Sequence, residues 1–160
     1  MKKNIKNFLF AVSVFILGGC VGSMPEYKSS NSTFIVFKTP TIRYADQGFV
    51  SKADSETKVE IYSNGQAVMR LRITPTQVCL SSLACMSGEE FNKKVLNASY
   101  PSDTIGKIFR GEEIFGGKGK IETQNGFIQK IGSIFYKVEG ENIEFTDPAA
   151  GVKIRVNSNS

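Results

Sequence analysis

Apolar and polar residues alternate along much of this chain, most clearly between residues 57 and 73. Val59 and Ile61 are flanked by charged residues, and the alternation resumes after a turn at residues 63–66. A repeat of two residues places the apolar side chains on one face of a β-strand. The turn contains an Asn-Gly dipeptide, which is typical of tight hairpins. The sequence therefore predicts two antiparallel strands at residues 57–62 and 67–73.

Shorter apolar or alternating segments recur on both sides of this hairpin, and turn-forming residues separate most of them. Such spacing is typical of a series of short antiparallel strands. We predict the further strands at residues 34–37, 42–51, 77–80, 119–123, 127–131, 133–138, 142–146 and 152–156. The expected fold is therefore mainly antiparallel β, in a single domain at residues 34–160.

Two segments interrupt the strand pattern with the spacing of a helix. Ser87 begins a capping box, in which its side chain caps the first turn and Glu90 reaches back, so a helix of about nine residues follows. A second short helix at residues 102–110 ends at Gly111, a residue type common at helix ends. The fold class is thus α+β with two short helices. An immunoglobulin-like β-sandwich, built from the same strands, is the alternative.

The first nineteen residues predict a secretion signal. Three lysines precede an apolar run at residues 8–17. Ten residues rise about 15 Å in a helix, whereas a bilayer core is about 30 Å thick, so the run is a signal-peptide segment and not a membrane span. Residues 17–20 read Leu-Gly-Gly-Cys, which resembles the lipobox of bacterial lipoproteins. We therefore assign residues 1–19 to the signal peptide.

The lipobox resemblance implies that Cys20 is the lipid-anchor residue and carries a covalent diacylglycerol and an N-acyl chain. No other cofactor is expected. Two or three acyl chains hold a protein on a membrane stably, whereas a single chain anchors it only marginally. Val21 stands where an Asp retains many such proteins in the inner membrane, so the resemblance implies the cell outer membrane, facing the periplasm. Polar residues 20–33 predict a lipidated flexible tether.

Charge changes the picture of possible partners. The full chain has 20 basic and 15 acidic residues and a net charge of +5. Removal of residues 1–19 takes away three lysines and no acidic residue, which leaves +2. A strongly basic surface is therefore not indicated, and nucleic acid, which also lies in another compartment, is not an expected partner.

The candidate catalytic motifs do not match known chemistry. The chain has no histidine, which excludes Ser-His and Cys-His pairs and most zinc sites. The glycine-rich residues 111–118 have Gly117 where a phosphate-binding loop requires lysine. Glu89 with Glu90, and Glu112 with Glu113, are sequence neighbours, which do not face each other on a helix. We expect no catalytic residue, no metal site and no enzymatic activity.

Cys79 and Cys85 are the other two cysteines of the chain. In an oxidising envelope, a disulfide is the default state of such a pair. A redox-active pair is the alternative, but the spacing lacks the C-x-x-C pattern of thioredoxin-like proteins. The sequence therefore predicts a disulfide that closes a short loop.

Three segments together carry a resemblance to a known family. They are the hairpin at residues 58–73, the proline-led helix at residues 100–111, and the two strands and turn at residues 142–156. In this order they resemble the outer-membrane lipoprotein receptor LolB family over about two-thirds of the mature chain. The polar turn at residues 63–66 departs from the family, which has an apolar residue protruding there.

The resemblance implies an open, curved half-barrel whose mouth is plugged by the helices. It implies that the protein binds the acyl chains of other lipoproteins, accepts them from a periplasmic carrier and places them in the outer membrane. An acyl chain requires a dry apolar cavity. The expected lining is Val59, Ile61, Met69, Leu71, Ile73, Ile105, Ile108, Phe109, Phe135, Ile143 and Phe145. The same side chains could equally fill a solid core, as in a structural or surface-exposed envelope lipoprotein without a lipid cavity.

Overall fold

A computed structural model describes residues 26–81 and 83–158. The predicted signal peptide and the predicted lipid-anchor residue Cys20 lie outside the described residues. Within these two ranges, no helix is both long enough and apolar enough to cross a bilayer.

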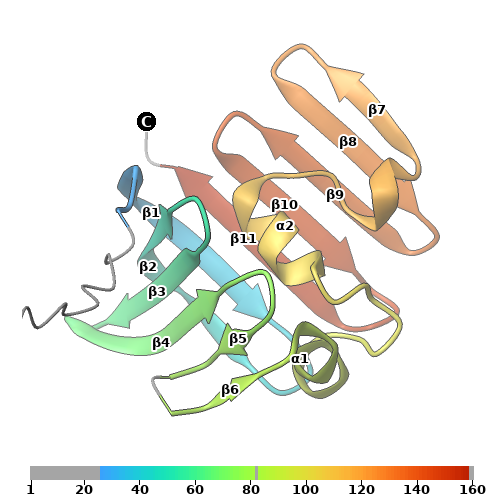
Figure 1. Cartoon of the computed structure of the whole chain (residues 1–160). Helices are drawn as coiled ribbons and strands as arrows, with labels where there is room; N and C mark the ends of the chain where they lie inside the picture. Colours follow the sequence, from blue (N-terminus) through green and yellow to red (C-terminus); the bar gives the residue numbers. More distant parts are fainter. Residues whose placement is uncertain (1–25, 82, 159–160) are drawn as a thin grey trace, which may run out of the picture.

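The described strands form one antiparallel sheet of eleven strands (Figure 1). Its strand order is β6-β5-β4-β3-β2-β1-β11-β10-β9-β8-β7. The strands are β1 (Ser29–Lys38), β2 (Arg43–Lys52), β3 (Thr57–Ser63), β4 (Gln66–Ile73), β5 (Val78–Cys79), β6 (Cys85–Met86), β7 (Lys120–Thr123), β8 (Gly126–Ile131), β9 (Ile134–Glu139), β10 (Asn142–Asp147) and β11 (Val152–Ser158). The sheet therefore consists of two series of consecutive strands, and β1 pairs with β11 to join them.

The single sheet corrects the alternative of an immunoglobulin-like sandwich. A sandwich needs two sheets that face each other, whereas all the described strands belong to one sheet. The pattern of the individual strands is the same in both folds. What distinguishes them is the pairing of β1 with β11, which joins Ile35 to Val156, two residues far apart in the sequence. That contact cannot be read from local alternation.

The structure also corrects the extent of the tether. Residues 29–33 were expected to belong to it, but they form the first half of β1 and pair with β2 from Ser29 opposite Lys52. Polar side chains are compatible with a strand here because the backbone hydrogen bonds to β2 do not depend on them. The two-residue strand β6, which pairs with β5, was not predicted either.

Two α-helices lie between β6 and β7 in the sequence: α1 (Gly88–Val95) and α2 (Thr104–Arg110). The side chain of Ser87 accepts a hydrogen bond from the backbone of Glu90, as expected for a helix cap. The carboxylate of Glu90 does not reach back, because it binds Lys94 one turn later. Gly111 ends α2 with a φ of 71°, in the left-handed region that favours glycine.

Helix α2 lies over one face of the sheet, in front of β10 and β11 in Figure 1. It contacts both β3 and β10, which stand on opposite sides of the central strands β2, β1 and β11. The ring of Phe109 stacks on Phe37 of β1, with ring centroids 6.3 Å apart. The core therefore lies between α2 and the sheet.

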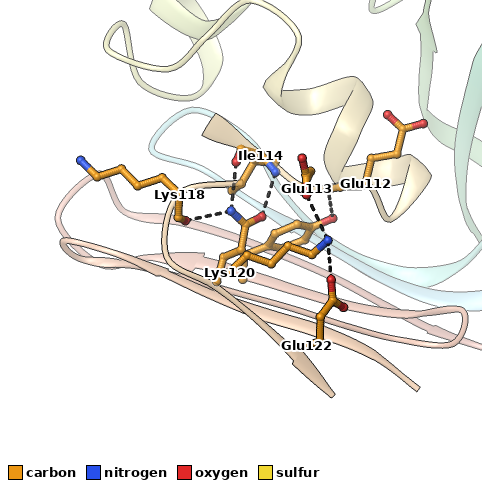
Figure 2. Close-up of polar contacts among 8 residues, drawn as sticks. Glu112, Glu113, Ile114, Lys118, Lys120 and Glu122 are labelled. Atoms are coloured by element: carbon orange, nitrogen blue, oxygen red, sulfur yellow. Dashed lines mark hydrogen bonds and ion pairs between the residues drawn. The ribbon is translucent and has the colours of Figure 1, made fainter. Parts of the chain in front are cut away.

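The segment that follows α2 is fixed to the sheet by a buried amide. Gln129 of β8 is fully buried, accepts a hydrogen bond from the backbone N–H of Ile114 at 2.8 Å, and donates to the carbonyls of Ile114 and Lys118, each at 3.0 Å. Figure 2 shows this arrangement, with Lys120 between the carboxylates of Glu113 and Glu122. The short 3₁₀ turn η1 (Phe115–Gly117) is thereby held against β8.

A buried carboxylate holds the segment between α1 and α2. Asp147 of β10 accepts hydrogen bonds from the hydroxyls of Tyr100, at 2.5 Å, and Ser133, at 2.7 Å. Burial by itself would raise the pKa of Asp147, but these bonds and those from the backbone of Ala149 and Ala150 outweigh it and lower the pKa. Burial and the neighbouring carboxylate raise the pKa of Tyr100.

Candidate functional site

The structure brings ten of the eleven residues expected to line a cavity into one buried cluster. They come from β3, β4, α2 and β10, so they converge from both series of strands and from the helix above them. The ten are Val59, Ile61, Met69, Leu71, Ile73, Ile105, Ile108, Phe109, Ile143 and Phe145. None is more than 6% exposed.

Phe135 is the exception. It is half-buried, whereas its neighbours Ile134 and Tyr136 are buried and face the core. Tyr136 stands opposite Phe145 of β10, which places Phe135 on the other face of the sheet. The sequence contained a signal for this, because Ile134, Tyr136 and Val138 repeat at every second position. Three apolar residues on one face of the strand indicate the buried face more strongly than a single phenylalanine on the other face.

These side chains pack as a core and leave little space. A pocket of about 40 Å³ lies beside Phe109, with Val50, Ile143 and Val156 also on its wall. Pockets that hold small-molecule ligands measure roughly 300–1,000 Å³. With α2 in its present position, this pocket does not hold an acyl chain.

Polar contacts at one end hold α2 in place. The ammonium of Lys52, at the end of β2, donates to the carbonyl of Arg110 at 3.2 Å, and the Arg110 guanidinium donates to the carbonyl of Ala53 at 3.0 Å. Burial lowers the pKa of Lys52. The two bonds run in opposite directions between the same two segments, so they fix the C-terminal end of the helix to the end of β2.

A larger depression of about 470 Å³ lies at the edge of β4, and we call it the β4 groove. Its wall combines polar surface, to which Arg70 and Ser81 contribute, with a similar amount of apolar surface. The apolar part comes from Ile42, Tyr44, Ala67, Val68, Met69 and Leu80. It exists because β4 is longer than its neighbour: the short β5 pairs with Arg72 and Ile73, and residues 66–71 have no partner on that side in the described chain. Met69, buried in the core, forms part of its wall and connects the groove to the apolar interior.

The predicted disulfide joins Cys79 of β5 to Cys85 of β6, with an S–S distance of 2.03 Å. Further bonds tighten the enclosed loop: the hydroxyl of Ser81 accepts from the backbone of Leu83 and Ala84. The side chain of Leu83 is 95% exposed, the most exposed of the large hydrophobic residues in the described ranges. No pattern in the sequence distinguishes Leu83 from other apolar residues.

A second depression, of about 390 Å³, adjoins the β4 groove and is lined by both charged and apolar side chains. We call it the basic groove, because Lys58, Arg70 and Arg72 line it, together with Tyr27 and Ser81. Tyr27 donates a hydrogen bond of 2.5 Å to Glu56. Burial and this bond raise the pKa of Tyr27 to about 12. Both grooves include Arg70 and Ser81, so they meet beside β4 and the start of the disulfide loop.

The remaining candidates for chemistry occupy structural positions. Gly111 is the helix end described above, and η1 forms the turn within the glycine-rich segment. Glu113 forms an ion pair with Lys120, and the backbone carbonyl of Glu112 accepts a hydrogen bond of 3.0 Å from Tyr136. Among the described residues, no group of three or more His, Cys, Asp or Glu side chains is arranged to hold a metal ion.

No model of a known protein family and no curated protein matches the chain. Its function is therefore argued from the geometry. Within the described residues, the β4 groove combines a partly apolar wall, a volume in the range of ligand pockets and direct contact with the core through Met69. These properties make it the candidate functional site.

Proposed function

We propose that this protein is a lipoprotein of the outer membrane, anchored through Cys20 and facing the periplasm, which binds acyl chains of other lipoproteins. This is the role that the resemblance to the LolB family implies. The acyl chain would come from a periplasmic lipoprotein carrier and pass on to the membrane. No covalent chemistry is needed, since weak and non-directional apolar contacts allow both uptake and release.

The β4 groove is the single observation that carries this proposal. Its wall is partly apolar, it measures about 470 Å³, and Met69 connects it to the buried face of the sheet. An acyl chain that enters along Tyr44 and Val68 would exchange contact with water for contact with side chains. Helices that cross one face of an open antiparallel sheet also agree with the plugged half-barrel that the resemblance implies.

Because the interior is filled, a long acyl chain could enter it only if α2 moved. The sheet-facing residues form a continuous apolar surface under this helix, but the pocket beside Phe109 is small. A long chain could continue past Met69 if α2 moved away. The bonds of Lys52 and Arg110 would then have to break. In this proposal the groove receives the chain, and displacement of α2 lengthens the binding surface.

One observation favours a second candidate, a structural envelope lipoprotein without a lipid cavity. The pocket of about 40 Å³ is far below the size of an acyl-chain site, so the interior already serves as an ordinary core. In that case the β4 groove would remain an unfilled surface depression.

Photolabelling of the full-length lipidated protein in detergent distinguishes the two candidates. The probe is a synthetic triacylated peptide with a diazirine in one acyl chain, and mass spectrometry maps the adducts. We expect adducts at the β4 groove, and severalfold less labelling in Val68→Glu, because this change replaces an apolar contact by a second charge beside Arg70, which an apolar ligand must desolvate. Ile121→Glu is the matched control, since Ile121 is exposed on β7, at the opposite edge of the sheet.

Adducts that are equally frequent in both variants would assign the labelling to another surface. Labelling no stronger than that given by a diazirine peptide without acyl chains would favour the structural candidate.

A further inference from the structure

Most of β4 has an unpaired outer edge. The short β5 pairs only with the last two residues of β4 (Figure 1), so residues 66–71 have no strand partner on that side among the described residues. The backbone N–H of Thr74 donates to the carbonyl of Gln77, across the turn to β5, at 2.9 Å. Backbone groups alternate in direction along a strand, so those of Arg70, four residues earlier, point toward the same side. This edge therefore offers hydrogen-bonding groups to a further strand.

The space beside this edge is open. The β4 groove follows the strand, since Ala67, Val68, Met69 and Arg70 line it in succession, and it measures about 470 Å³. Val68 has no partner in the register with β3 and is 39% exposed. Neighbouring strands lie about 4.8 Å apart, so an added segment would occupy the space directly beside β4. The groove provides that space.

The side chains of β4 alternate between two environments. Met69 and Leu71 are buried and face the core. Arg70 and Arg72 point to the other face of the sheet, where their side chains are 65% and 51% exposed. The side chains of an added strand would alternate in the same way. Every second one would lie beside apolar residues of the groove, and those between them would lie beside the arginines.

The charged face of this edge carries an excess of positive charge. Three cations form ion pairs with two carboxylates: the cations are Lys58, Arg70 and Arg72, and the carboxylates are Glu60 and Glu56. Glu60 alone binds both Lys58 and Arg70. Lys58 also stands directly opposite Arg72 in the ladder, where like charges repel each other. An incoming carboxylate would offset this repulsion.

The same charges disfavour a second copy of this chain at the edge. If two β4 strands paired with each other, Arg70 and Arg72 of both copies would lie close together on neighbouring strands, and like charges in such positions are destabilising. Charged side chains on edge strands commonly prevent self-association in this way. The arginines therefore select against β4 itself and favour an acidic strand.

We propose that the open edge of β4 binds an extended polypeptide segment of another protein, in which apolar and acidic residues alternate, as an additional antiparallel strand. In this mode of recognition, backbone hydrogen bonds supply affinity and alternate side chains supply specificity. The inference goes beyond acyl-chain binding and does not depend on it, because the β4 backbone and Arg70 make the contact.

Synthetic peptides test the proposal on the full-length lipidated protein in detergent. The probe is a fluorescent peptide of alternating valine and glutamate, and fluorescence anisotropy measures its dissociation constant. Two modified versions carry N-methyl groups, on the glutamates in one and on the valines in the other. In an antiparallel pair, the residue opposite Arg70 shares its face and directs its N–H toward β4. The glutamate N–H groups should therefore make the bonds.

We expect methylated glutamates to weaken binding by about tenfold or more, since two or three hydrogen bonds are lost. Methylated valines should leave the dissociation constant within about twofold of its original value, because their N–H groups point away from β4. Equal effects of the two modifications, or the reverse order, would overturn the proposal. So would the absence of binding by the unmodified peptide.

Charge reversal tests the acidic preference. Arg70→Glu should weaken binding of the valine–glutamate peptide by about tenfold and allow a valine–lysine peptide to bind instead. Lys130→Glu is the matched control, since Lys130 is exposed on β8, near the opposite edge of the sheet. Equal weakening in the two variants would assign the effect to net charge and contradict the contact at β4.

Two further outcomes separate this inference from its alternatives. A full-length protein that binds no peptide but forms a dimer, which Arg70→Glu changes and Lys130→Glu does not, would assign the edge to a second copy and overturn the proposal. If the acylated probe labels the β4 groove but the valine–glutamate peptide does not bind, this inference alone fails. Peptide binding without acyl-chain labelling supports this inference and leaves acyl-chain binding refuted.

Discussion

The two edges of this sheet are built from similar alternating strands but differ in how many of their polar groups have partners. At the β7 edge, Gln129 holds the preceding loop through three hydrogen bonds, and Lys120 joins Glu113 to Glu122. At the β4–β6 edge, part of β4 has no strand partner in the described chain and apolar residues are exposed. Short, charged edge strands discourage contact with other molecules, whereas open apolar edges favour it. The comparison separates a closed edge from one available for binding.

The largest effect is expected from removing the buried amide at the closed edge. Gln129→Leu leaves the backbone N–H of Ile114 and two carbonyls without their partner, which should cost about 3 kcal/mol of unfolding free energy. Gln66→Leu makes the same chemical change at the exposed start of β4 and should change stability by less than about 0.5 kcal/mol. Urea unfolding measures both. Similar losses in the two variants would remove the distinction between the edges.

A smaller effect is expected from opening the disulfide. Cys79→Ser/Cys85→Ser frees a short loop, and the loop-closure entropy corresponds to about 2 kcal/mol. Hydrogen exchange should accelerate at residues 78–86, which contain the loop closed by the disulfide. It should remain unchanged at residues 126–158, because Gln129 and Asp147 hold that region without the disulfide. Uniform acceleration along the chain would mean that the edges unfold as one unit.

The smallest effect at neutral pH is expected at Asp147. Asp147→Asn keeps one oxygen acceptor but loses the charge that strengthens the bonds from Tyr100 and Ser133, so it should cost about 1 kcal/mol. Since the folded state lowers the pKa of this carboxyl, its contribution is complete above the unfolded value of about 3.9 and is lost as pH falls through the lower folded value.

Wild type and Asp147→Asn should therefore converge in stability below about pH 4. Urea midpoints measured across that range and at neutral pH provide the check. A constant difference at all pH values would show that Asp147 acts only through the shape of its side chain.

Most elements of this fold follow from local pattern. The hairpin of β3 and β4 is predicted by alternation and an Asn-Gly turn, and Ser87 and Gly111 mark two helix ends. The disulfide was predicted from two cysteines and an expected oxidising compartment. These features depend on residues close together in the sequence, so short-range rules are sufficient to find them.

The outward orientation of Phe135 could have been found from the alternation of Ile134, Tyr136 and Val138, but the other two misses have a common cause. Ser29–Thr33 is a strand because β2 lies beside it, and β6 has two residues and exists through pairing with β5. In each case a distant or neighbouring strand decides the outcome. The periodicity of a single segment carries no information about that partner.

By itself, the sequence determined the order of strands and helices, ten of the residues that form the apolar centre, and the cysteine pair that closes the loop. Only the tertiary structure decided that the strands form one sheet and that α2 covers one face of it. The position of the two grooves around Ser81 was likewise decided by the tertiary structure. The physical reason is that alternation specifies which side of a strand avoids water. The pairing of distant strands, and the volume that their side chains leave between them, specify whether that side becomes a core or a binding site.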